Sequence, residues 1–192
     1  MVIMFDVDGC LADFIQGYNK MALTIPRQYA VRPLNEGSRW GDYNDVVVWD
    51  HIKRSRTFFF ELPSMQEFIT KPELWMRIAK LEQDNDVYFV TSRQGVHVKR
   101  QTQDWLTRRG VYDPSVIITP DKGETARVIK ADFAIDDKAG NAMFIKYQRQ
   151  KCESFILDKP YNQWDPTMVG TKVRRIFSVE EYINAVETGD RA

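Results

Sequence analysis

The sequence is poor in residues that form covalent cross-links or bind transition metals. Its 192 residues include two cysteines, Cys10 and Cys152, and two histidines. Two cysteines cannot build a disulfide framework, and neither belongs to a C-x-x-C pair of the kind that binds zinc. Because unpaired cysteines are typical of proteins in reducing compartments, we expect a cytoplasmic location.

An excess of charge of one sign and a long apolar run are also missing. The 27 lysine and arginine residues balance 27 aspartate and glutamate residues, whereas a nucleic-acid binder usually carries a basic excess. No stretch reaches the ~18 apolar residues of a membrane span, and the opening MVIMFDVDG lacks the basic start of a secretory signal. We therefore expect neither nucleic acid nor a membrane as a partner, and we leave a homodimer open.

Five short apolar runs alternate with longer segments of helical periodicity. The runs are Val2–Phe5, Val87–Val90, Val116–Ile118, Phe133–Ile135 and Phe155–Leu157. The helical segments are Glu73–Glu82, Val98–Arg109, Ala139–Gln150 and Val179–Glu187. Strands without internal polar residues, separated by helices, are typical of a parallel sheet covered on both faces. We predict an α/β fold with a Rossmann-like sheet, and a further strand before the last helix.

One segment interrupts this alternation. About 80 residues separate the first two apolar runs, far more than the dozen or so of a common crossover. Residues 24–64 are rich in aromatic and basic side chains, and we interpret them as a small, mainly helical cap inserted after the first strand. Residues 1–23 and 65–192 would then form the core domain.

Acidic residues follow two of the predicted strands directly. Asp6 and Asp8, with Gly9 to turn the chain, end the first run, and Asp136 and Asp137 end the fourth. Taken singly, the first pair is also compatible with a strand-end cap and the second with a solvated turn. The carboxyl ends of parallel strands meet at one edge, however, where four acids would repel one another without a cation. Mg²⁺, a hard ion that prefers oxygen ligands, suits such a site.

Two further strand ends carry groups that suit a phosphate. Thr91 and Ser92 offer hydroxyls and turn amides, and Lys122 offers a compact ammonium that can neutralise a phosphate and a carboxylate together. Each alone is a common turn or loop residue. Together with the acids they favour phosphate chemistry.

These four strand ends, in this order, resemble the haloacid-dehalogenase-type phosphatases. The matching motifs are FDVDG, VTS, PDK and AIDD. The resemblance implies that Asp6 attacks phosphorus and forms an aspartyl-phosphate, and that Asp8 is the general acid and base.

The same resemblance assigns the remaining polar residues. Thr91 and Ser92 would bind the transferring phosphate and Lys122 would steady it. Mg²⁺ would be held by Asp6, the Asp8 backbone carbonyl and the second acid pair, with Asp137 and Asp136 as the candidates.

The sequence in and around the predicted cap resembles one family within this group, the 5′(3′)-deoxyribonucleotidases. The matching segments are VDGCLADF, TFFFEL, ITPDK and AIDDK. The resemblance implies that Phe14, Phe59 and Trp40 contact the nucleobase, although the same aromatic residues could form the cap's own small core.

We therefore expect a Mg²⁺-dependent phosphomonoesterase that hydrolyses nucleoside 5′-monophosphates and favours deoxyribonucleotides. Two alternatives stay open: a phosphatase for another small phosphoester or a polynucleotide 3′-phosphate, and a non-catalytic nucleotide- or metal-binding module. Retention of both acids in D-x-D favours an enzyme, because binding a phosphate requires no nucleophile.

Overall fold

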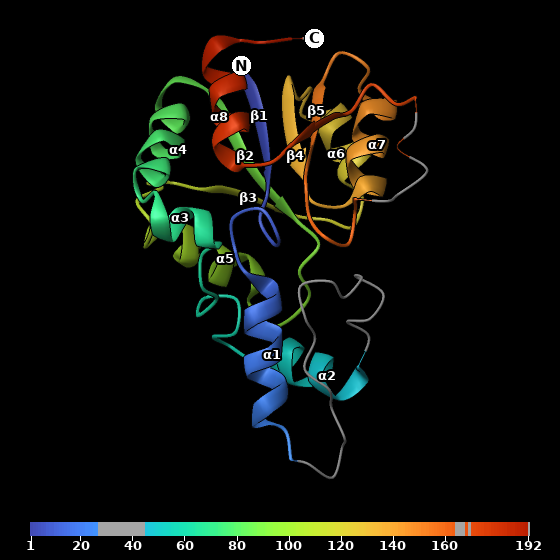
Figure 1. Cartoon of the computed structure of the whole chain (residues 1–192). Coiled ribbons are helices and arrows are strands. Elements are labelled where there is room, and N and C mark those ends of the chain that lie inside the picture. The colour runs from blue at the N-terminus through green and yellow to red at the C-terminus, as the bar shows by residue number, and fades with distance from the viewer. Residues whose placement is uncertain (27–44, 164–167, 169, 192) are drawn as a thin grey trace.

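A computed structural model describes residues 1–26, 45–163, 168 and 170–191 (Figure 1). Its strands are β1 (Val2–Asp6), β2 (Asp86–Thr91), β3 (Ser115–Ile118), β4 (Phe133–Asp136), β5 (Glu153–Leu157) and β6 (Arg174–Ile176). Its helices are α1 (Phe14–Thr24), α2 (Val46–Arg54), α3 (Gln66–Thr70), α4 (Glu73–Asp84), α5 (Val98–Thr107), α6 (Lys122–Val128), α7 (Ala139–Gln148) and α8 (Val179–Thr188).

The six strands form one parallel sheet in the order β3-β2-β1-β4-β5-β6. Every apolar run that predicted a strand lies in one of them, so the predicted α/β fold with a Rossmann-like sheet is confirmed. The sheet reverses its direction of growth at β1, which neighbours β2 on one side and β4 on the other. In open sheets of this kind, ligands bind beyond the carboxyl ends of the strands at that point.

Helices cover both faces of the sheet, and β1 shows why. Ile3 and Phe5 belong to a buried apolar cluster that includes residues of α4, α5 and α8, whereas Met4 packs in a second cluster with residues of α6 and α7. Alternate side chains of a strand point to opposite faces, so both faces of this strand are buried. Figure 1 shows α4 and α8 on one side of the sheet and α6 and α7 on the other.

The strand register aligns the polar strand ends. Asp6 pairs with Val90, one residue before the end of β2, and Phe5 pairs with Ile135, one residue before the end of β4. The last residues of β1, β2 and β4 are therefore neighbours along one edge of the sheet.

Helices α1 and α2 lie side by side beyond this carboxyl edge (Figure 1). Of the two, α2 falls within the predicted inserted segment. Trp40, predicted with Phe14 and Phe59 to contact the base, lies outside the described residues. The predicted division at residues 24 and 64 stays a prediction.

A buried amide on α5 joins the end of the inserted segment to the core. The Gln101 side-chain oxygen accepts a hydrogen bond from the Phe59 N–H at 3.0 Å. Its Nε2 donates to the carbonyls of Ser55 at 3.0 Å and Val96 at 2.7 Å. Since Gln101 is buried, these three bonds tie the 55–59 segment to the loop that follows β2.

Replacing Gln101 by methionine, which has a similar shape, should destabilise the protein. The change leaves the buried Phe59 N–H without its partner, and one such group costs about 1–3 kcal/mol. We expect a fall of about this size in the free energy of unfolding, measured by urea denaturation. Gln103→Met on the same helix is the control, because Gln103 is half-buried and makes one 3.3 Å bond to Pro114. Equal stability of the two variants would contradict the role given to Gln101.

Candidate active site

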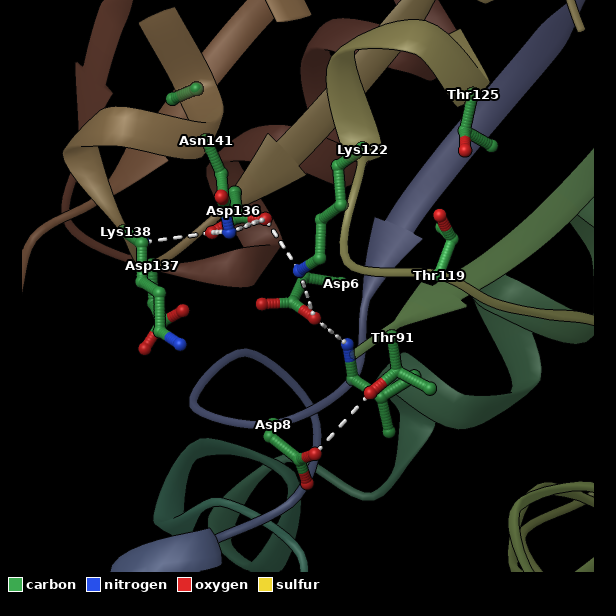
Figure 2. A network of polar contacts seen from close by, with 12 residues as sticks. Asp6, Asp8, Thr91, Thr119, Lys122, Thr125, Asp136, Asp137, Lys138 and Asn141 are labelled. Carbon is green, nitrogen blue, oxygen red and sulfur yellow. Dashed lines mark hydrogen bonds and ion pairs between the residues drawn. The ribbon is translucent and has the colours of Figure 1, made fainter. Parts of the chain in front are cut away.

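A buried lysine between two buried aspartates forms the centre of the site. Lys122 Nζ lies 2.6 Å from Asp6 Oδ1 and 2.6 Å from Asp136 Oδ2 (Figure 2). All three side chains are at most 4% exposed. Burial alone would lower the pKa of Lys122, but Asp136 and Asp6 outweigh it and raise that pKa above its ordinary value. The ammonium is therefore charged and offsets part of the negative charge at the sheet edge.

The position of Lys122 follows from how α6 begins. Asp121 accepts a hydrogen bond from the Glu124 N–H at 2.8 Å and so caps the helix. Lys122 is the first helical residue, next to the carboxyl end of β3. A strong cap at this position starts the helix immediately and aims the lysine back over the edge of the sheet.

The two acids after β4 have different surroundings. Both oxygens of Asp136 are engaged, because they pair with Lys122 and accept from the Lys138 N–H at 2.8 Å and from Asn141 Nδ2 at 3.1 Å and 3.2 Å. Asp136 therefore has the contacts of a residue that holds Lys122 in place.

Asp137 faces the turn that follows β1. The Tyr161 hydroxyl donates a hydrogen bond to Asp137 Oδ2, and Asn162 Nδ2 donates to the Asp137 carbonyl at 2.7 Å. Gly9, with φ of +87°, lies so close that a Cβ there would stand 2.2 Å from the same Oδ2. Any side chain at position 9 would displace the carboxylate, so the turn requires glycine for space as well as for its backbone angle.

The acids suit a hard divalent cation. A carboxylate oxygen of Asp6, one of Asp137 and the sulfur of Cys10 all lie within 4.8 Å of one another. Burial and then the neighbouring Asp136 raise the pKa values of Asp6 and Asp137, because three carboxylates crowd a site with a single buried lysine among the described residues. Burial also raises the pKa of the Cys10 thiol, which disfavours the thiolate that a soft metal would need. The oxygen donors therefore fit Mg²⁺.

Asp8 is held by an arginine that follows β2. Arg93 Nε lies 2.8 Å from Asp8 Oδ2, and a terminal nitrogen of Arg93 lies 2.7 Å from Asp8 Oδ1. The Thr91 hydroxyl stands 3.4 Å from Asp8 Oδ2 (Figure 2). The second acid of the D-x-D pair thus occupies a separate, half-buried environment, away from Lys122.

Most of the residues predicted for the site surround one cleft. Its polar side contains Asp6, Asp8, Thr91, Ser92 and Lys122, and its aromatic side contains Phe14, Trp49 and Phe59. Asp136 and Asp137 lie behind this surface and are fully buried. Phe14 and Trp49 stack with ring centroids 5.7 Å apart.

The residues of this arrangement that did not emerge from the sequence as site residues include Trp49, Arg93, Lys138 and Tyr161. Arg93 and Lys138 follow the VTS and AIDD motifs directly, and both line the cleft. In the sequence, only their position directly after these motifs indicated that Arg93 and Lys138 belong to the site. Tyr161 comes from a loop after β5 with no motif of its own, so only the fold brings it to Asp137.

The overall structure is similar to that of known hydrolases. One, from Burkholderia xenovorans LB400, is described as haloacid dehalogenase-like; it is 12% identical, with a TM-score of 0.63 over 100% of this chain and 98% of the other. Another is a D,D-heptose 1,7-bisphosphate phosphatase of B. bronchiseptica complexed with magnesium and phosphate. It is 12% identical, with a TM-score of 0.55 over 98% of this chain and 99% of the other. These likenesses show the haloacid-dehalogenase-like fold.

Sequence comparison is more specific. No curated protein matches the chain significantly. No helix among the described residues combines the length and apolar character needed to cross a membrane. Residues 1–176, which include every site residue described above, match the family described as 5′ nucleotidase, deoxy (pyrimidine), cytosolic type C protein (NT5C). The chain therefore belongs to this family and is a phosphoric monoester hydrolase of the 5′-nucleotidase type.

Proposed function

We propose that the protein is a Mg²⁺-dependent cytoplasmic enzyme that hydrolyses nucleoside 5′-monophosphates, deoxyribonucleotides preferentially, through an aspartyl-phosphate on Asp6. The observation that carries the proposal is a buried carboxylate paired with Lys122, two residues from a second acid, in a cleft with one aromatic side. The description of the family, which names deoxy and pyrimidine, supports the choice of leaving group.

The first displacement uses Asp6 as the nucleophile. Its Oδ1 pairs with Lys122 and accepts from the Val7 N–H at 2.6 Å, so we assign the attack on phosphorus to Oδ2. The bond from Oδ2 to phosphorus forms as the bond from phosphorus to the nucleoside oxygen breaks. Lys122 offsets the charge of the approaching phosphate, and the Thr91 hydroxyl and the Ser92 turn lie where they can contact its oxygens.

Asp8 completes both displacements. Protonated Asp8 gives its proton to the departing nucleoside oxygen, a poor leaving group as an alkoxide. The carboxylate so formed then takes a proton from water as the water oxygen attacks phosphorus. The bond from phosphorus to Asp6 breaks, which releases inorganic phosphate and restores both side chains.

The cation would be held by Asp6, Asp137 and the Asp8 backbone carbonyl. When bound, Mg²⁺ would supply positive charge that screens the phosphate from the carboxylate nucleophile. We assign the cation to Asp6 and Asp137 because a carboxylate oxygen of each lies in one group within 4.8 Å, whereas Asp136 keeps Lys122 in place.

Phosphate release from a panel of substrates tests the function. We expect Mg²⁺-dependent release from deoxynucleoside 5′-monophosphates, abolished in Asp6→Asn and by chelation, with acid-quenched wild type carrying phosphate on Asp6. Asp158→Asn is the control, since Asp158 pairs with Arg175 outside the cleft. Activity confined to sugar phosphates or a 3′-phosphorylated oligonucleotide would overturn the substrate class. No activity from a folded protein would favour a binding module.

Removal of one proposed ligand should weaken metal binding without substrate present. Mg²⁺ that binds only the folded state raises the melting temperature in proportion to RT ln(1 + [Mg²⁺]/Kd). We expect this increase to be small or absent in Asp137→Asn and intact in the control Asp158→Asn. A normal Mg²⁺-dependent shift in Asp137→Asn, measured by differential scanning calorimetry, would exclude Asp137 as a ligand.

The aromatic side of the cleft should bind the base. Stacking on an aromatic ring is worth about 1–3 kcal/mol per base, so Phe14→Leu should raise KM for nucleotides about 5- to 150-fold. KM for glycerol phosphate, which has no base, should stay close to the wild-type value. The control is Phe58→Leu, because Phe58 packs edge-on against Phe14 but does not line the cleft. Equal effects on both substrates would show that Phe14 only supports the structure.

A further inference from the structure

Arg93 is a buried arginine whose guanidinium holds both oxygens of Asp8. It is 4% exposed, and its Nε and one terminal nitrogen lie 2.8 Å and 2.7 Å from the two carboxylate oxygens. Two parallel bonds from a planar group to a carboxylate set the plane of that carboxylate as well as its position. Of the contacts that Asp8 makes, this pair is the shortest, since the Thr91 hydroxyl is 3.4 Å away.

The remaining sides of the guanidinium are also occupied. Its other terminal nitrogen donates to Thr102 Oγ1 at 2.9 Å, and Thr102 donates in turn to the Val98 carbonyl on α5 at 2.8 Å. The guanidinium carbon lies 4.8 Å from the ring centroid of Phe59, on the aromatic side of the cleft. Arg93 is therefore held by α5 behind it and by the aromatic wall beside it.

A charge buried in this way is unfavourable for folding unless it is well paired. The partner of Arg93 is a side chain at the cleft: the Asp8 side chain is 14% exposed, whereas the Arg93 side chain is fully buried. The pair thus presents the carboxylate to a substrate and keeps the arginine behind it. This orientation differs from that of an ordinary surface ion pair, in which both partners face water.

We propose that Arg93 is a positioning residue that sets the orientation of Asp8 for proton transfer to the leaving group, and that its contact with Phe59 links this orientation to the wall of the base site. The proposal rests on the function of Asp8 proposed above. An acid must lie within hydrogen-bond reach of the atom it protonates, and small misplacements of reacting groups lower rates greatly.

Arg93→Lys is the main test variant. Lysine keeps the charge but cannot form two parallel bonds to a carboxylate while also bonding to Thr102 and stacking on Phe59. Single-turnover experiments with enzyme in excess report the first displacement alone. For a deoxynucleoside 5′-monophosphate, whose leaving oxygen needs a proton, we expect release of the nucleoside to slow on the order of 10- to 100-fold.

A second substrate separates positioning from structural damage. With p-nitrophenyl phosphate the departing nitrophenolate is stable without a proton, so Arg93→Lys should slow its release far less. In an Asp8→Asn background, Arg93→Lys should cause no additional loss with the nucleotide, because the group it positions is already gone.

Arg109→Lys is the matched control. Arg109 stacks at 3.7 Å on Trp105 and bonds to Ser64 and to the Leu62 and Trp105 carbonyls, but it does not line the cleft. We expect it to lower the melting temperature and to leave the ratio of the two single-turnover rates unchanged.

Equal slowing of both substrates by Arg93→Lys, or additive losses in the double variant, would overturn the positioning role. If Asp8→Asn itself slows both substrates equally, the acid role of Asp8 fails instead. Because the two results come from different variants, the two failures are distinguishable.

Discussion

The site depends on the burial of negative charge at one edge of the sheet. Three carboxylates, those of Asp6, Asp136 and Asp137, are almost fully removed from water, and like charges so close together repel strongly. Lys122 relieves part of this repulsion by pairing with two of them. The start of α6 beside β3, the asparagine on α7 that bonds to Asp136, and the glycine of the first turn all serve this arrangement.

Similar residues acquire different roles because their surroundings differ. Asp6 lies against a buried ammonium, whereas Asp8, two residues on, lies against a guanidinium and faces the cleft. Two neighbouring carboxyl groups in separate environments can take different parts in one reaction. Asp136 and Asp137 show the same separation. One is saturated by protein donors, and the other faces Asp6 across the proposed cation site.

The sequence predicted the parts that depend on uninterrupted apolar runs and motif order. The strands and the placement of Asp6, Thr91 and Asp136 at one edge followed from them, since a buried strand ends where its apolar run ends. The beginning of β5 could not be predicted in this way, because Glu153 and Ser154 are polar yet buried. The Ser154 hydroxyl donates to the Ala142 carbonyl. Helix α6 was not predicted, because it is seven residues long and lacks apolar periodicity. Contacts such as those of Arg93 and Tyr161 arise only when distant segments meet.

Helix α5 contacts both the residues around Asp8 and the aromatic side of the cleft. Its adjacent residues Gln101 and Thr102 hold, respectively, the Phe59 backbone and the Arg93 guanidinium. Arg93 then contacts the Phe59 ring on one side and both Asp8 oxygens on another. With Asp8 as the proposed acid, a displacement of Phe59 by an ill-fitting leaving group would reach it through the Arg93 side chain. In such an arrangement, discrimination between leaving groups acts on the rate of proton transfer as well as on binding.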